Sequence, residues 1–274
     1  MKKVALVLII IIAFLYLIPI IYVFTNSFMD ERQLSSDGVH LIPEAFNLQQ
    51  YYRIALFKGQ YFKFFLNSLK ITSIIIGGQL VFSVIPAYAF AKMRFPGRNI
   101  IFIIYVMALL LPFQVTLVPN YLVFDKLEKM LKIQFIDTHL ALILPGIFNT
   151  FGVFLLKQFI REIPDEIIQA AKIDGACDFK IFFTIIIPII RPAILSLIVL
   201  TFIDNWNILE QAIVFIDSVE KLPLSLFLET IYYDDFSVFY GGGVLYMIPA
   251  IIIFLRCEKY LREGFNVGGN KQYD

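Results

Sequence analysis

Long runs of apolar residues dominate the chain, and short polar segments separate them. A membrane-spanning helix needs about 20 mostly apolar residues, and six segments meet this requirement. The pattern therefore predicts six transmembrane helices, at about 4–24, 66–91, 100–122, 139–160, 192–216 and 243–260. All 274 residues then form one membrane domain, 1–274, without room for a separate soluble domain. The expected fold class is an all-α membrane protein.

The fifth span has two possible positions. The apolar run 181–203 contains Arg191 between two prolines, and an arginine near a helix centre costs about 2.5–3.5 kcal/mol on insertion. Moving the span to 192–216 puts Pro192 at the first helical position, where its missing amide donor is harmless. The move brings a group of polar residues and one tryptophan into the span, namely Asp204, Asn205, Trp206, Asn207 and Glu210.

Polar side chains at membrane depth normally face a water-filled cavity or the interior of a helix bundle. Asp204 would lie about 18 Å along the helix from Pro192, near mid-membrane. We therefore predict that Asp204, Asn205, Trp206, Asn207 and Glu210 line a substrate pathway, with Trp206 able to stack on a sugar ring. Two alternatives remain: polar packing between helices, or a helix that ends early at the outer surface.

Composition and charge agree with a membrane protein. The chain is 59% hydrophobic and 16% charged, against about 45–50% and 25% in soluble domains. The loop from Lys92 to Arg98 holds three basic residues and no acidic one, and basic residues gather on the cytoplasmic side. With six crossings both termini are then cytoplasmic. Cys177 and Cys257 also fall on that side, where a disulfide is not expected.

No constellation for chemistry within this chain is present. The sequence lacks a HExxH motif, paired cysteines and a Ser-His-Asp spacing. Gly264 and Gly269 have the spacing of a P-loop, but Asn270 occupies the lysine position and no strand precedes it. We expect no catalytic residue, no metal site, no cofactor and no nucleic-acid partner, so that the chain by itself is not an enzyme.

A charged, alanine-rich segment, PDEIIQAAKIDGA, lies between two apolar runs. Pro164 suits the start of a helix, acidic residues follow it, and Gly175 suits a left-handed end. A helix of about ten residues is marginal alone. We therefore expect 179–187 to fold back as a second short helix against the inner rim of the bundle and to leave the alanines facing outward. The loop 163–187 would be cytoplasmic. The plainer alternative is an ordinary helix between spans.

The stretch PDEIIQAAKIDGACDFKIFFTIIIPIIRP resembles the EAA loop of the inner-membrane permeases of binding-protein-dependent ABC importers. Five residues match that motif, with Gln169 in place of its glutamate: Ala170, Ala171, Asp174, Gly175 and Pro188. The pairs Asn67-Ser68 and Trp206-Asn207, with Ala87-Tyr88-Ala89 and the tail from Arg262, extend the similarity. Together these resemble the carbohydrate-uptake subclass, in particular its shorter six-helix permease of the maltose-transporter type.

The resemblance implies a type I ABC importer permease fold and a set of partners. These are a second homologous permease forming a heterodimer, two cytoplasmic ATPases that bind ATP and Mg, and an extracytoplasmic solute-binding protein. The implied ATPase-docking residues are Glu166, Gln169, Ala170, Ala171, Asp174 and Gly175. In the cytoplasmic tail 261–274, Gly268, Gly269 and Lys271 would contact the ATPases. The implied cargo is a sugar or oligosaccharide moved inward.

One alternative function comes from a different class. A secondary transporter driven by an ion gradient could use Asp204 as its ion carrier. Such folds often show internal repeats, and no repeat is evident in this sequence.

Overall fold

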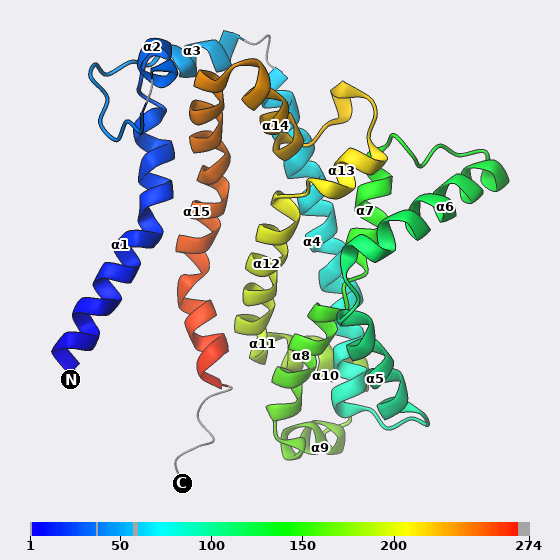
Figure 1. Ribbon diagram of the computed structural model, residues 1–274. Coiled ribbons are helices and arrows are strands. Elements are labelled where there is room, and N and C mark those ends of the chain that lie inside the picture. Colours follow the sequence, from blue (N-terminus) through cyan, green and yellow to red (C-terminus); the bar gives the residue numbers. More distant parts are fainter. Residues whose placement is uncertain (1, 37, 57–59, 268–274) are drawn as a thin grey trace. The chain divides into compact units, whose positions relative to one another are not determined.

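The computed structural model describes residues 2–36, 38–56 and 60–267. Over these residues the chain is helical and contains no β-strand (Figure 1). Contacts within the chain group its residues into two compact units. The first unit comprises 1–66 with 223–249, and the second unit comprises 67–222 with 250–274. Two long helices, α4 (Gln60–Lys92) and α15 (Phe236–Val267), begin in the first unit and continue in the second.

The first unit contains one long apolar helix and several short ones. Its complete helices are α1 (Lys2–Asn26), α2 (Glu31–Ser35), α3 (Gln49–Leu56) and α14 (Leu224–Asp234). α1 is apolar on every side, and none of its most apolar stretch is buried, which is typical of a helix solvated by lipid. Arg53 in α3 ties this unit together, because its guanidinium pairs with Asp235 at 3.0 Å and donates to the Ser237 hydroxyl at 3.2 Å.

The second unit holds the remaining helices. They are α5 (Arg98–Leu109), α6 (Phe113–Leu131), α7 (His139–Ile147), α8 (Thr150–Glu162), α9 (Asp165–Ile173), α10 (Asp178–Ile181), α11 (Ile187–Ile189), α12 (Arg191–Trp206) and α13 (Glu210–Phe215). A π-helical segment, Phe182–Ile186, joins α10 to α11, and a short 3₁₀ turn, Val219–Lys221, follows α13.

Among the described residues, four helical stretches are long and apolar enough to cross a membrane, namely α1, α4, α7 together with α8, and α15. The number rises to six if each of two bent pairs also counts as one span. The bent pairs are α5 with α6, at 101°, and the segment 178–189 with α12, at 72°. The first bend falls at Pro112, which precedes α6 and cannot donate a backbone hydrogen bond. The expected span 100–122 is therefore not one straight helix.

Other helix limits also differ from the sequence-based ones. The second and sixth expected spans, 66–91 and 243–260, extend to Gln60–Lys92 and Phe236–Val267. The fourth, 139–160, is interrupted at Phe148, and the Asn149 side chain caps α8 by accepting from the Phe151 amide at 2.8 Å. The fifth, 192–216, is wrong as a continuous helix because α12 ends at Trp206.

Close packing of α4 on α7 depends on two glycines. A Cβ built on Gly78 would come within 2.5 Å of the Ile147 side chain, and one on Gly146 within 2.8 Å of Ile75. The close approach also allows the Gln79 side-chain amide to donate to the Gly146 carbonyl at 2.7 Å. Small residues at such crossings let helix backbones approach in membranes, where hydrophobic association is weak.

Replacing Gly78 by alanine is expected to destabilise the protein by about 1–3 kcal/mol, because the branched Ile147 side chain must move to make room. The neighbouring Gly77→Ala is the matched control, since nothing lies within 4 Å of a Cβ there. That variant should be neutral or stabilising by about 0.5–1 kcal/mol in a helix interior. Apparent melting temperatures of the purified chain in detergent measure both. Equal melting temperatures for the two variants would contradict the packing argument.

Candidate functional site

Helix α9 is formed by local signals at both of its ends. Pro164 precedes it, and Asp165 and Glu166 occupy its first turn, where acidic side chains favour the positive end of the helix dipole. At the other end Gly175 has a φ of +80°. Its amide donates to the Lys172 carbonyl at 3.0 Å, while the Ala176 amide reaches the Ala171 carbonyl at 2.9 Å. These two bonds form a Schellman turn, which ends the helix sharply.

One face of α9 packs on the bundle. Ile168 is buried, and Ala171 is half-buried against a core that includes Ile181, Phe182 and Ile186 from the second half of the loop. The segment 179–187 packs against the bundle, as predicted, since these three residues share their core with Ala87 and Leu156. The prediction that both alanines face outward is wrong for Ala171, since only Ala170 is exposed. Helical periodicity separates adjacent residues by about 100°, so the two cannot share one face.

The outer face of α9 is open. The predicted docking residues Glu166, Gln169, Asp174 and Gly175 are exposed together with Ala170. Ile173 is 86% exposed, and Phe179, just after the turn, is 73% exposed. Neither was selected from the sequence, although both are large apolar residues in a charged loop. Exposed apolar residues gathered on one surface mark a site of interaction.

Two ion pairs hold α9 in place. Lys92, the last residue of α4, pairs with Asp165 at 2.6 Å and also donates to the Ile163 carbonyl. Lys172 pairs with Asp178 across the Schellman turn at 2.8 Å. The hydrogen bond from Lys92 lowers the pKa of Asp165, and the hydrogen bond to Asp178 raises the pKa of Lys172. α9 is therefore connected directly to α4.

A hollow of about 440 Å³ lies beside the start of α9. Its lining is mostly apolar and comes from the ends of α8, α9 and α12, including Phe159, Ile163, Ile167 and Ile190. Ile167 is partly exposed at its rim. The hollow includes Ile163, whose carbonyl accepts from Lys92, and so lies next to the connection between α9 and α4.

A larger cavity, of about 660 Å³, also lies in the second unit, and two of the predicted pathway residues line it. Asp204 and Asn205 line it from the end of α12. Polar side chains from α4, α6, α7–α8 and α13 complete it, namely Gln79, Asn120, Asn149 and Gln211. We call it the polar cavity.

The other three predicted pathway residues do not line the polar cavity. Trp206 is 2% exposed and stacks on Phe202, with ring centroids 5.1 Å apart. Asn207 is exposed where α12 ends, and Glu210 begins α13, where its carboxylate accepts from Gln114 at 3.0 Å. The prediction assumed one helix over 192–216. The helix ends at Trp206, so Asn207 and Glu210 do not continue it, whereas Trp206 lies within α12 and is buried there.

Sequence reasoning missed the residues that other helices contribute to the polar cavity. Gln79 is a lone polar residue in a long apolar run, and this signal could have identified it. Its amide group bridges helices, donating to Gly146 and accepting from the Thr201 hydroxyl at 2.8 Å. Gln79 therefore links α4 to α12 directly beside Asp204 and Asn205.

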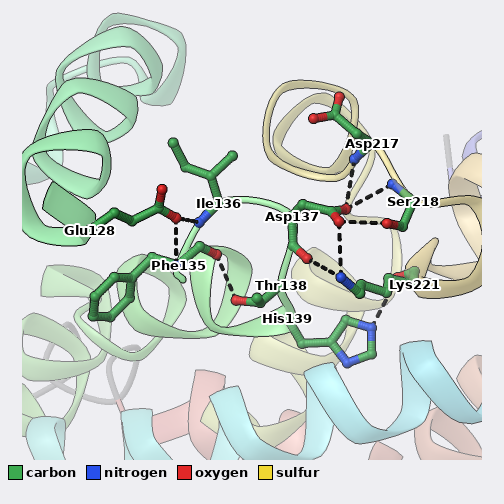
Figure 2. Close-up of polar contacts among 9 residues, drawn as sticks. All are labelled: Glu128, Phe135, Ile136, Asp137, Thr138, His139, Asp217, Ser218 and Lys221. Carbon is green, nitrogen blue, oxygen red and sulfur yellow. Dashed lines mark hydrogen bonds and ion pairs between the residues drawn. The ribbon is translucent and has the colours of Figure 1, made fainter. Parts of the chain in front are cut away.

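Asp137 is the centre of a polar cluster that closes the loop between α6 and α7 over the segment after α13 (Figure 2). Its carboxylate accepts from the amides of Asp217, at 3.0 Å, and Ser218, at 2.7 Å, and it pairs with Lys221 at 2.9 Å. The Ser218 hydroxyl donates to it as well. These donors, Ser218 foremost, hold the pKa of Asp137 well below its ordinary value.

The predicted tail contacts Gly268, Gly269 and Lys271 lie outside the described residues. The described part of the C-terminal segment differs from the expectation, because helix α15 continues to Val267 and so includes residues expected to form the tail 261–274.

The sequence profile of one family matches residues 79–262, which include α9, the Schellman turn and the residues of both hollows. Its description is "Binding-protein-dependent transport system inner membrane component". The chain belongs to this family. The match confirms the resemblance first found in the loop 163–187. The protein is thus a multi-pass membrane permease component, and the alternative of an ion-gradient-driven transporter with Asp204 as carrier is not retained.

Individual relatives of this permease match three quarters of its length or more. The arabinooligosaccharide transport system permease protein AraQ of Halalkalibacterium halodurans is 30% identical over 95% of this chain and 93% of its own. GgtD of Synechocystis, an osmoprotective-compound uptake permease protein, is 33% identical over 76% of this chain and 70% of its own. A crystal structure of a bacterial ABC transporter that imports alginate matches with a TM-score of 0.83, at 26% identity over 94% of this chain and 95% of that one.

Proposed function

We propose that this permease component imports a sugar or oligosaccharide and docks a cytoplasmic ATPase through α9. The observation that carries the docking role is the rigid outward face of α9, stabilised by the Schellman turn and by ion pairs at both ends. In this arrangement both termini and α9 are cytoplasmic. ATP and Mg bind to two partner ATPase subunits, where hydrolysis takes place. A second, homologous permease and an extracytoplasmic solute-binding protein complete the importer.

Contacts within the second unit support a route by which α9 moves the transport pathway. A push on α9 reaches α4 through Lys92 and Asp165, which lie 2.6 Å apart. α4 carries Gln79, whose side chain bonds Thr201 of α12 and lines the polar cavity. A rigid element with several fixed contacts transmits displacement as a whole. Closure of the ATPases would therefore reshape the polar cavity at Asp204 and Asn205.

The cargo class rests on the relatives and on the chemistry of the polar cavity. AraQ carries the name of an arabinooligosaccharide system, and the alginate importer transports a polysaccharide. Amide and carboxylate groups at Asn120, Asn149, Asp204 and Gln211 can hydrogen-bond sugar hydroxyls. GgtD, which serves osmoprotective compounds, is a reason to test other small polar solutes alongside oligosaccharides.

Replacing Ala170 by arginine tests the docking role. Ala170 is exposed on α9, so the chain should fold normally, but a bulky charge in a closely packed interface should lower ATPase capture by about tenfold. Co-purification of the cognate ATPase with the full-length chain measures this effect. Ala55→Arg is the matched control, because Ala55 is also an exposed helical alanine, in α3. Undiminished capture by Ala170→Arg would refute docking through this face.

A further inference from the structure

A small basic pocket lies between α5 and α8, apart from both the outer face of α9 and the polar cavity. It has a volume of about 240 Å³ and is lined by Arg98, Lys157 and Arg161, with Asn99, Phe90 and Phe102 completing it. We call it the cation pocket. A second hollow, of about 520 Å³, shares Arg98 and Asn99 with it and adds Arg94. Four basic residues therefore surround two adjoining hollows.

The charges in the cation pocket are not neutralised by the protein. Within the described part of the chain, Arg98, Lys157 and Arg161 form no ion pair with a carboxylate. The Lys157 ammonium instead lies 3.1 Å from the centroid of the Phe102 ring, and Arg98 donates to the Met93 carbonyl at 3.1 Å. Like charges held together without a counterion favour an anion.

The start of α5 adds to the positive potential. Gly97 precedes α5 and provides no side-chain cap, and the first turn contains no acidic residue. Arg98 and Asn99 are the first two residues of this 12-residue helix and line the cation pocket. The uncapped amides and the helix dipole attract an anion to the same place as the basic side chains.

The surface next to the cation pocket is apolar. No residue of α5 is buried in the chain, and its outward side chains are large, with Ile100 67% and Met107 62% exposed. α5 belongs to one of the bent pairs apolar enough to span a membrane. A ligand with an anionic head and long apolar chains would satisfy both surfaces, whereas a free inorganic anion would satisfy only the first.

We propose that the cation pocket binds the phosphate headgroup of an anionic phospholipid, whose acyl chains lie along α5. The pocket lies at the same end of the second unit as α9 (Figure 1). Lys92 pairs with Asp165 of α9, and the short loop that follows Lys92 leads to Arg98 in the pocket. Basic pockets between membrane helices on the cytoplasmic side suit such headgroups. The Arg and Lys side chains would pair with the phosphate oxygens.

Native mass spectrometry of the full-length chain in a non-ionic detergent tests the proposal, with dioleoyl phosphatidylglycerol as the probe. We expect one molecule of phosphatidylglycerol to bind per chain, with an affinity about tenfold higher than that of phosphatidylcholine. Lys157→Gln with Arg161→Gln should reduce phosphatidylglycerol binding by about tenfold. Lys126→Gln with Lys129→Gln, which removes two charges from α6, should change it less than about twofold.

A single-residue variant and a competition with inorganic phosphate complete the test of the lipid site. Arg98→Gln alone changes a partly exposed residue at the first position of α5 and should weaken binding by about threefold to tenfold even if the double variant folds poorly. Inorganic phosphate at millimolar concentration should not displace the lipid. Unchanged affinity in both pocket variants would overturn the site, and displacement by inorganic phosphate would overturn the assignment to a lipid. Neither result bears on ATPase docking, which the Ala170→Arg experiment tests separately.

Discussion

Replacing Gly175 by proline is expected to lower ATP-driven transport by about a hundredfold while leaving the chain inserted in the membrane. Gly175 has a φ of +80°, and proline is restricted to about −65°. The change also removes the amide that donates to the Lys172 carbonyl and disfavours the near-helical backbone of the preceding Asp174. Together these effects cost about 3 kcal/mol or more, enough to disrupt the Schellman turn.

A graded series at Gly175 separates backbone conformation from side-chain bulk. Nothing lies within 4 Å of a Cβ at this position, so any loss comes from the backbone. Asparagine tolerates the left-handed region and should keep transport within about threefold of the wild type. Alanine should lose about tenfold, since this conformation costs it about 1–2 kcal/mol.

Uptake by the complete importer reconstituted in proteoliposomes measures the Gly175 series, and ATP hydrolysis by the same complex reports coupling. In the proline variant we expect ATP hydrolysis to continue without accompanying uptake, so that the two activities are uncoupled. If all three variants transported equally well, the turn would have no part in coupling, and α9 would be an ordinary connecting helix.

Replacing Asp137 by alanine is expected to destabilise the protein by about 2–3 kcal/mol. Its carboxylate accepts from two backbone amides and the Ser218 hydroxyl and pairs with Lys221, and removing it leaves these donors without their acceptor. Asp137 also has a φ of +57°, which alanine tolerates poorly. Asp217→Ala is the matched control, because Asp217 contributes its amide and its side chain points away from the cluster (Figure 2).

The pH dependence of stability gives an independent test of the Asp137 cluster. Folding lowers the pKa of Asp137, so the cluster stabilises the protein fully above the ordinary aspartate pKa of about 3.9 and loses this contribution as the pH falls below it. The apparent melting temperature of the wild type should fall with pH in this range. Asp137→Ala should show a smaller fall, and an identical fall in both proteins would exclude Asp137 as its source.

The sequence predicted α9 well because its signals are local. The proline before it, the acidic first turn and the glycine after it act within a few residues of one another, and each specifies a backbone conformation directly. The inward packing of Ala171 was not predicted, because it depends on Ile181, Phe182 and Ile186 returning to the same core.

The polar cavity, in contrast to α9, was predicted only in part, because its residues come from several helices. Asp204 and Asn205 could be selected as polar residues in an apolar segment, but Trp206, Asn207 and Glu210 were placed beside them by assuming a continuous helix. The helix ends at Trp206, so Asn207 and Glu210 lie beyond it, while Trp206 itself is in α12 and packs against Phe202. Gln79 and Asn120 lie far away in the sequence and join the cavity only through the packing of other helices.

The sequence by itself determined that the chain is a membrane protein, at which residues α9 begins and ends, and that the chain is related to binding-protein-dependent permeases. These follow from composition, helix-end chemistry and a contiguous motif, which need no knowledge of distant contacts. The tertiary structure decided where the helices bend, which polar side chains share a cavity and that Arg98, Lys157 and Arg161 meet without a counterion. The physical reason is that bends and cavities depend on packing between segments far apart in the chain, and hydropathy carries no information about that packing.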